Sequence, residues 1–207
     1  MMRHAIAHLQ GSKIREVANA GLGRSDVLAF WFGESDEVTS QAVRDEAKAS
    51  LDRGETFYSH NLGLAELRQA IAGYTSALHG PVEMDRIVVT SSGVSGLMLA
   101  TQLLLDPGDE VVAVTPVWPN LTAQPQILGA QVVRLPLSVR HGVWSLDLDR
   151  LRQTVTSTTK VLLVNAPNNP TGWTLPAAQQ RAILEHCRQT GTWIVADEVY
   201  ELSLIHI

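Results

Sequence analysis

The feature that most constrains the fold is a series of short, almost uninterrupted apolar runs that alternate with helical patterns from about Ile87 onward. Runs that are apolar throughout are typical of strands buried on both faces of a parallel sheet. The expected strands are 87–90, 110–114, 131–135, 160–165 and 192–196, and the expected intervening helices are 96–105, 119–128, 146–154 and 175–190. This order predicts an α/β fold with three layers, α/β/α, around a mainly parallel sheet.

The first 80 residues have a different pattern, with helical periodicity at 38–51 and 64–78 and no comparable apolar runs. We expect residues 1–50 to form an N-terminal arm or part of a small domain. Residues 51–201 are then part of a large domain that carries the parallel sheet.

Charge and composition exclude several classes of function. The net charge is −5 and the pI is about 5.8, without any lysine- or arginine-rich run, so nucleic acid is not an expected partner. No apolar run approaches the roughly 18 residues that span a bilayer, and the first ten residues lack the long apolar core of a secretory signal. The single cysteine, Cys187, excludes an internal disulfide. We therefore expect a cytoplasmic protein without a membrane partner.

Small and aromatic residues follow the first two expected strands. In an open parallel sheet, ligands bind at the carboxyl ends of the strands. Ser92, Gly93 and Val94 come directly before a helix, where backbone N–H groups can bind a phosphate. Serine is also a common helix N-cap, which is the purely structural alternative. Trp118 follows the next strand and can present a flat face to an aromatic ring, or can simply be buried by packing.

Two more polar groups follow the later strands. Asn168 and Asn169, in an Asn-Pro-rich turn, offer side-chain amides that can donate to a ligand oxygen. Asp197 ends an apolar run, so its carboxylate needs a partner, and a protonated ring nitrogen is a suitable one. Tyr200 lies three residues later and could reach the opposite edge of the same ring. The structural alternative for Asp197 is helix capping.

Taken together, these residues resemble the class I/II aminotransferases, which are fold-type-I pyridoxal-phosphate (PLP) enzymes. The most specific motifs are Asn165–Gly172 and Asp197–Tyr200, with further similarity at Gly33, Tyr58, Gly63, Leu67, Arg68 and 107–109. The resemblance implies an aminotransferase that moves an amino group between an amino acid and a 2-oxo acid, in amino acid metabolism and biosynthesis. It also implies the large domain of a PLP-dependent transferase, truncated, with the N-terminal part of a small domain.

The resemblance assigns roles to individual residues. Ser92, Gly93 and Val94 would hold the phosphate of PLP, and Trp118 would stack on its ring. Asn169 and Tyr200 would hydrogen-bond the 3′-oxygen, while Asp197 would pair with the ring nitrogen. Tyr58 would reach the phosphate of the neighbouring subunit, which implies a homodimer. Gly33 would lie near the carboxylate of the substrate.

The chain departs from the family pattern at its catalytic lysine. The Schiff-base lysine of the family lies beyond the Asp-x-x-Tyr motif and has no counterpart here; Lys13, Lys48 and Lys160 match no catalytic position. We therefore expect no catalytic residue in this chain and an N-terminal fragment that is inactive alone. Residues 202–207 resemble a translated sequencing adapter, so we expect a non-native tail. A PLP-dependent lyase or decarboxylase of the same fold and a non-catalytic binding module are the alternatives.

Overall fold

The computed structural model describes residues 2–202, and it divides the chain into two compact units. One unit joins Met1–Gln10 to Ser91–Ile207 and contains the main sheet; we call it the sheet unit. The other, Gly11–Thr90, contains helices only and is called the helical unit. This division at Thr90 does not coincide with the expected boundary between residues 50 and 51. It reflects contacts within this chain, so the domain boundary of the family pattern stays a prediction.

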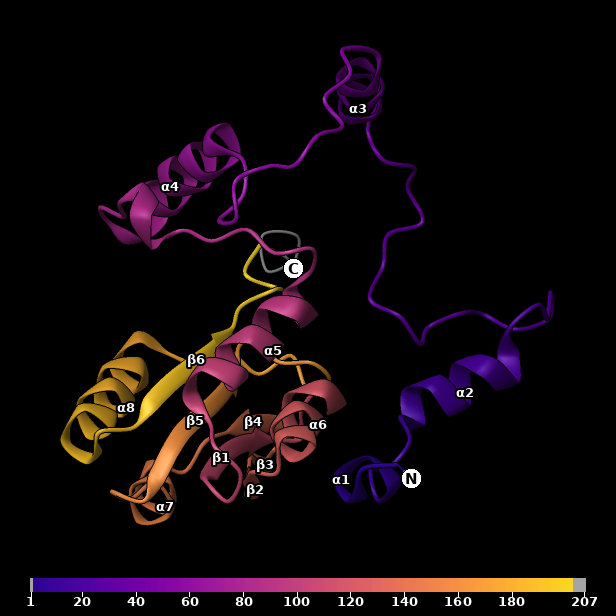
Figure 1. The fold of residues 1–207 in the computed structure, drawn as a ribbon. Helices are drawn as coiled ribbons and strands as arrows, with labels where there is room; N and C mark the ends of the chain where they lie inside the picture. The colour runs from indigo at the N-terminus through magenta and orange to yellow at the C-terminus, as the bar shows by residue number, and fades with distance from the viewer. Residues whose placement is uncertain (1, 203–207) are drawn as a thin grey trace. The chain divides into compact units, whose positions relative to one another are not determined.

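The main sheet consists of four parallel strands, in the order β2-β1-β5-β6 (Figure 1). The strands are β1 Glu110–Thr115, β2 Gln131–Pro136, β5 Thr159–Asn165 and β6 Trp193–Asp197. All four were expected from their apolar runs. The predicted parallel α/β fold is therefore confirmed.

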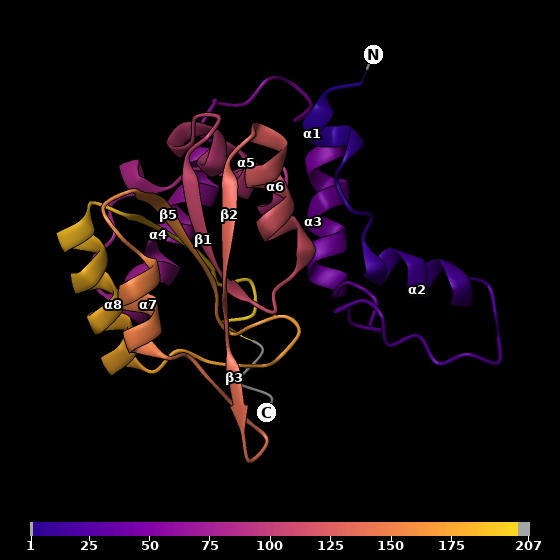
Figure 2. The ribbon, with the colours of Figure 1, turned by 90° about the horizontal axis from the view of Figure 1, so that it is seen from below.

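Helices cover both faces of this sheet, because successive side chains of a strand point to opposite faces. Val112 and Leu162 pack into a cluster with residues of α7 (Leu148–Thr154) and α8 (Ala177–Thr190). Val111 and Val161 pack into a second cluster, with residues of α5 (Gly93–Leu104) and α6 (Pro119–Leu128). Figure 2 shows the two helix pairs on opposite sides of the strands. The result is the expected three-layer arrangement.

Local sequence signals set the limits of these helices. Asp147 caps α7 by accepting hydrogen bonds from the N–H groups of Asp149 and Arg150, both at 3.0 Å. Gly129 ends α6 with φ 91°, a left-handed conformation in which a side chain is strained. A Cβ at Gly129 would also lie 3.2 Å from Pro107.

The expected strand at 87–90 is wrong. The 3-10 helix η1 (Met84–Arg86) precedes this segment, and the N–H of Val89 donates to the carbonyl of Leu62 at 2.9 Å. A β-branched run predicts extended backbone, but here that backbone bonds to a loop and not to the sheet. An unexpected hairpin joins β3 (Ser138–Arg140) to β4 (Val143–Ser145). The short helix α1 (His4–Ala7) was also unexpected.

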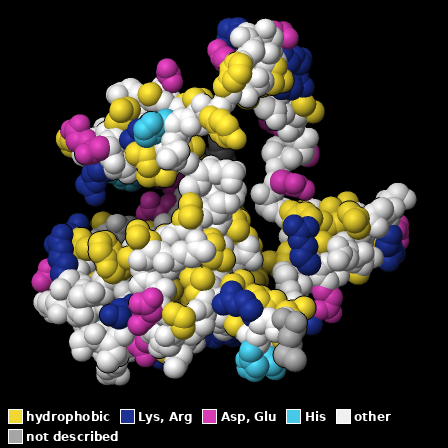
Figure 3. Space-filling model, in the orientation of Figure 1, with side chains coloured by type: hydrophobic (Ala, Val, Ile, Leu, Met, Phe, Trp, Pro, Cys, Tyr) yellow, Lys and Arg dark blue, Asp and Glu magenta, His cyan; other side chains and the backbone are white. Residues whose placement is uncertain are grey.

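The helical unit contains α2 (Lys13–Gly21), α3 (Gln41–Asp52) and α4 (Ala65–His79). The last two confirm the helices expected at 38–51 and 64–78. Figure 3 shows hydrophobic side chains at the surface of α2 and α3, where Val17, Val43 and Leu51 are exposed.

The expected absence of a membrane partner and the expected tail at 202–207 concern the rest of the chain. Among residues 2–202, no helix is both long enough and apolar enough to cross a membrane. The expected non-native tail begins at Leu202, and residues 203–207 lie outside the described part of the chain.

Candidate active site

The carboxyl ends of β5 and β6 meet at Asn165 and Asp197, which are paired in the sheet. Asn165 is 1% exposed, and its amide nitrogen Nδ2 donates to the backbone carbonyl of Asp197 at 2.9 Å. Its amide oxygen Oδ1 accepts the backbone N–H of Asn169 at 2.7 Å. One buried side chain thus joins the loop after β5 to the end of β6.

The side chain of Asn168 is also used inside the protein, which differs from the expectation that it faces a ligand. It is buried, and its Nδ2 donates to the carbonyls of Pro116 and Asn165, both at 3.3 Å. Its Oδ1 accepts the N–H of Thr171 at 3.1 Å and the hydroxyl of Thr171 at 2.7 Å. Asn168 therefore connects the loop after β1 to the loop after β5.

Asn169 and Tyr200 lie together at this edge of the sheet. The Nδ2 of Asn169 donates to the hydroxyl oxygen of Tyr200 at 3.2 Å, and both side chains are partly exposed. The structure thus brings together two residues that the sequence separates by about thirty positions and that the resemblance assigns to the same cofactor oxygen. The pair can offer two hydrogen-bond donors to one ligand oxygen, since the tyrosine proton is not used in this contact.

The carboxylate of Asp197 is half-buried and only partly satisfied. Its Oδ1 accepts the N–H of Val199 at 3.2 Å, in a local turn. Within the described residues Oδ2 accepts no hydrogen bond, and no helix follows Asp197 up to Leu202. Within the described residues, Asp197 therefore does not cap a helix. A half-buried carboxylate at the carboxyl end of β6, with one oxygen unused among the described residues, fits a cationic ring N–H.

The N-terminus of α5 is the part of the candidate site that offers backbone N–H groups. Ser92 is the N-cap, and its Oγ accepts the N–H of Ser95 at 3.1 Å. The first turn of a helix leaves further N–H groups without intrahelical partners. A Cβ at Gly93 would meet no atom within 4 Å, so the backbone there is open to a ligand. Ser92 is thus both a cap and part of a potential anion site.

A buried glutamine holds this helix end in place. The Nε2 of Gln124, on α6, donates to the carbonyl of Val94 at 3.0 Å. Gln124 was not among the candidate residues predicted from the sequence. Its signal was a polar residue within a helix that packs against a sheet. Trp118 precedes α6 as its N-cap residue. Its side chain is half-buried, so part of it is still exposed at this edge of the protein.

The two remaining candidate residues belong to the helical unit. Gly33 is exposed and lies in an irregular segment next to Phe32, whose ring is 4.8 Å from the guanidinium carbon of Arg15. Tyr58 is fully exposed in the loop between α3 and α4. Their roles at a substrate carboxylate and at a neighbouring subunit stay predictions.

A separate cavity of about 370 Å³ lies beside β6 and α8. It is lined mostly by apolar residues together with Glu198 and Glu201, and by none of the candidate cofactor residues. Within residues 2–202, no group of His, Cys, Asp and Glu side chains is arranged to bind a metal ion. The polar groups at the carboxyl ends of the strands are therefore the better candidate site.

Comparison with known proteins identifies the family. Residues 26–204 match the profile of the family "Aminotransferase class I and II". The chain is 31% identical to the aspartate aminotransferase of Pyrococcus horikoshii over 194 residues, covering 93% of this chain and 49% of that protein. It is 34% identical to the aspartate/prephenate aminotransferase of Thermus thermophilus over 177 residues, covering 85% and 46%.

The fold agrees with this match. A structure of a Thermus thermophilus aspartate aminotransferase mutant superimposes with a TM-score of 0.88 at 30% identity, covering 97% of this chain and 54% of that one. The chain therefore belongs to the class I and II aminotransferase family, and it spans about half the length of the curated relatives it matches.

Proposed function

We propose that this chain forms the first part of a PLP-dependent aminotransferase, which moves an amino group between an amino acid and a 2-oxo acid. The observation that carries the proposal is the group of three side chains after β5 and β6. Asn169 and Tyr200 are hydrogen-bonded to each other, and within residues 2–202 one carboxylate oxygen of Asp197 has no hydrogen-bond partner.

The residues present fit PLP. The open backbone at Gly93 and the N-terminus of α5 suit its phosphate, and the half-buried Trp118 suits its ring. The amide of Asn169 and the hydroxyl of Tyr200 suit the 3′-oxygen, which accepts two hydrogen bonds. Asp197 suits the ring nitrogen. When bound, PLP supplies an electron-accepting ring that stabilises negative charge at the α-carbon of an amino acid.

The chain's own contribution is electrostatic and geometric. The carboxylate of Asp197 would keep a proton on the ring nitrogen, because a charge-assisted hydrogen bond favours the protonated form. Asn169 and Tyr200 would fix the orientation of the ring in its plane. The N–H groups at Gly93 and Val94 would hold the phosphate, so that the ring is positioned from both ends.

The substrates and the assembly are proposed from the relatives. The matched proteins are named aspartate and aspartate/prephenate aminotransferases, so aspartate is the first amino donor to test. Gly33 would lie near the substrate carboxylate. The exposed Tyr58 would contact the phosphate bound by a second copy of the protein, in a homodimer.

The test uses the protein expressed from its own reading frame, including any codons that the source DNA adds beyond residue 207. We expect it to convert aspartate only when a 2-oxo acid acceptor such as 2-oxoglutarate is present. We expect Asp197→Ala to lower kcat on the order of 10²-fold or more, with PLP still bound, because it removes the partner of a charge that the reaction uses.

Glu198→Gln is the matched control, since Glu198 is the exposed carboxylate next in sequence. It should leave kcat nearly unchanged. Product formation without an acceptor would indicate a lyase or a decarboxylase on the same fold. Near-normal turnover of Asp197→Ala would contradict the role given to this carboxylate.

A further inference from the structure

The side chain of Asn165 contacts the backbone of two residues that the proposed function places on the cofactor ring, Asn169 and Asp197. Its Oδ1 accepts the N–H of Asn169 at 2.7 Å, and its Nδ2 donates to the carbonyl of Asp197 at 2.9 Å. The amide is 1% exposed, so water does not compete for either bond. One planar side-chain group therefore bonds to both of these backbones.

The carboxamide of Asn165 satisfies both contacts at once. It presents an acceptor and a donor on the same planar group, as the N–H of Asn169 and the carbonyl of Asp197 require. An aspartate would keep the acceptor but would place a second oxygen against the Asp197 carbonyl. An aliphatic residue would leave the Asn169 N–H without its partner. The Asp197 carbonyl would keep a weaker contact, because it also accepts the N–H of Ala166 at 3.2 Å.

We infer that Asn165 is a positioning residue of the candidate site, which acts through Asn169 and Asp197 and sets the spacing between the groups that hold the two edges of the cofactor ring. It does not itself reach the ligand, because both ends of its amide are used inside the protein. The inference rests on the proposed function for the identity of the ligand, and on the hydrogen bonds of Asn165 for the positioning.

The same two strands offer a matched control at their other end. Thr192, immediately before β6, is 7% exposed, and its hydroxyl donates to the carbonyl of Thr159, the first residue of β5, at 3.0 Å. Thr192→Val therefore removes a buried side-chain bond between the same strands, but far along them from Asn169 and Asp197. A merely structural role of Asn165 predicts the same behaviour for the two variants.

The experiment measures two quantities on the wild-type protein and on the variants Asn165→Ala, Asn165→Asp and Thr192→Val. The first is hydrogen exchange of the backbone N–H of Asn169, measured by NMR without any ligand. The second is the affinity for PLP compared with the affinity for inorganic phosphate, which probes the α5 N-terminus alone. Urea unfolding of each variant gives the loss of stability against which both are compared.

We expect Asn165→Ala to weaken PLP binding about tenfold and to leave phosphate binding unchanged. Exchange of the Asn169 N–H should rise about tenfold or more, beyond the change in strand residues of β5. Asn165→Asp keeps the acceptor, so it should retain most of the protection of Asn169 while still weakening PLP binding. It is also the second variant if Asn165→Ala fails to fold. Thr192→Val should lower stability without changing either readout.

Two results would overturn the inference. In one, Asn165→Ala and Thr192→Val weaken PLP binding equally; in the other, Asn165→Ala leaves both PLP affinity and the Asn169 exchange rate unchanged. Absence of PLP binding by the wild-type protein would instead contradict the proposed function. The exchange rate of the Asn169 N–H would then still decide whether Asn165 positions this loop.

Discussion

The sheet unit and the helical unit stabilise themselves by different means. In the sheet unit, the middle residues of two adjacent strands are completely buried: Val111, Val112, Ala113, Val161 and Leu162. In residues 11–90, all of which the structure describes, the buried residues are Ala18, Gly21, Arg68 and Ala72. None of these four has a large apolar side chain. The sheet unit therefore has a hydrophobic core of its own, whereas the helical unit buries little within itself.

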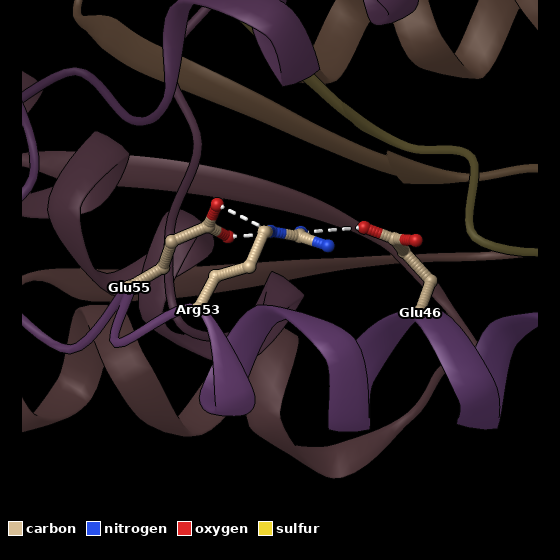
Figure 4. A network of polar contacts seen from close by, with 3 residues as sticks. All are labelled: Glu46, Arg53 and Glu55. Atoms are coloured by element: carbon tan, nitrogen blue, oxygen red, sulfur yellow. Dashed lines mark hydrogen bonds and ion pairs between the residues drawn. The ribbon is translucent and has the colours of Figure 1, made fainter.

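Polar contacts take the place of a core in the helical unit. The guanidinium of Arg68 donates to the carbonyls of Ile87 and Met84 at 2.9 and 2.7 Å, which ties α4 to the segment after η1. On the surface, Arg53 contacts Glu46 at 2.7 Å and Glu55 at 2.8 Å (Figure 4). Such contacts contribute less than buried apolar side chains. A substitution should therefore change stability by very different amounts in the two units.

The largest effect is expected from a core substitution in β5. Leu162→Ala removes a side chain that is 0% exposed and should lower the free energy of unfolding by about 2–5 kcal/mol. Leu51→Ala, at the end of α3, removes the same atoms, but Leu51 is 66% exposed. The free energy of unfolding should therefore change by no more than about 0.5 kcal/mol. Urea unfolding measures both. Equal losses would break the comparison, because they would mean that Leu51 packs into a core of similar quality.

The next effect tests the buried polar contact of the helical unit. Arg68→Met keeps much of the aliphatic length but removes both guanidinium hydrogen bonds. The partly buried carbonyl of Ile87 then loses this donor, and the carbonyl of Met84 keeps the N–H of Ile87 at 3.1 Å. It should lower the free energy of unfolding of the helical unit by about 1–3 kcal/mol. Arg44→Met, on the exposed surface of α3, is the control and should have almost no effect. Hydrogen exchange of the α4 amides localises the change. A loss confined to the sheet unit would contradict this account of Arg68.

The strands of the sheet unit were easier to predict from the sequence than the segments around them. The central residues of β1 and β5 are apolar without interruption and buried, as strands covered on both faces require. The runs that became β2 and β6 have weaker support, since β2 contains Arg134 and β6 is only partly buried. Residues 87–90 have a similar composition, but the sequence does not specify a hydrogen-bond partner, and Val89 bonds to Leu62. The sequence signal for the β3–β4 hairpin is Gly142 in the two-residue connection between the strands, which the prediction did not use. In the structure His141 and Gly142 both have positive φ, as a tight hairpin turn requires.

The candidate site was predicted in part, for a related reason. The motifs placed Asn169, Asp197 and Tyr200 after strands whose carboxyl ends meet, and parallel topology brings such residues to one edge. The sequence did not reveal which asparagine amides turn inward, because Asn165, Asn168 and Asn169 have the same chemistry. The structure separates them by their partners: Asn165 and Asn168 bond to backbone groups of the strand ends, while Asn169 bonds to Tyr200.

A smaller effect compares helix caps in the two units. Asp147 accepts two N–H groups at the start of α7, and Asp147→Ala should cost about 1 kcal/mol of stability. Ser40 occupies the same position before α3 but makes no such hydrogen bond, so Ser40→Ala should be close to neutral. Thermal or urea unfolding of both variants gives the difference. A clear loss in Ser40→Ala would show that α3 depends on its cap as much as α7 does.

The smallest effect is the pH dependence of the surface cluster in Figure 4. The Arg53 guanidinium, followed by a hydrogen bond from Ser50, lowers the pKa of Glu55 from 4.5 to about 2. A carboxyl whose pKa is lowered by folding stabilises the folded state above its unfolded pKa, and this contribution is lost as the pH falls through the folded pKa. The stabilisation by Glu55 should therefore be complete above about pH 5 and disappear towards pH 2.

An NMR titration of the Glu55 carboxyl measures this shift directly. In Arg53→Met its pKa should return most of the way to 4.5, and high salt should weaken the shift in the wild-type protein, because the cluster is exposed to solvent. An unchanged pKa of Glu55 in Arg53→Met would mean that this ion pair does not form in solution. The polar account of the helical unit would then rest on Arg68 alone.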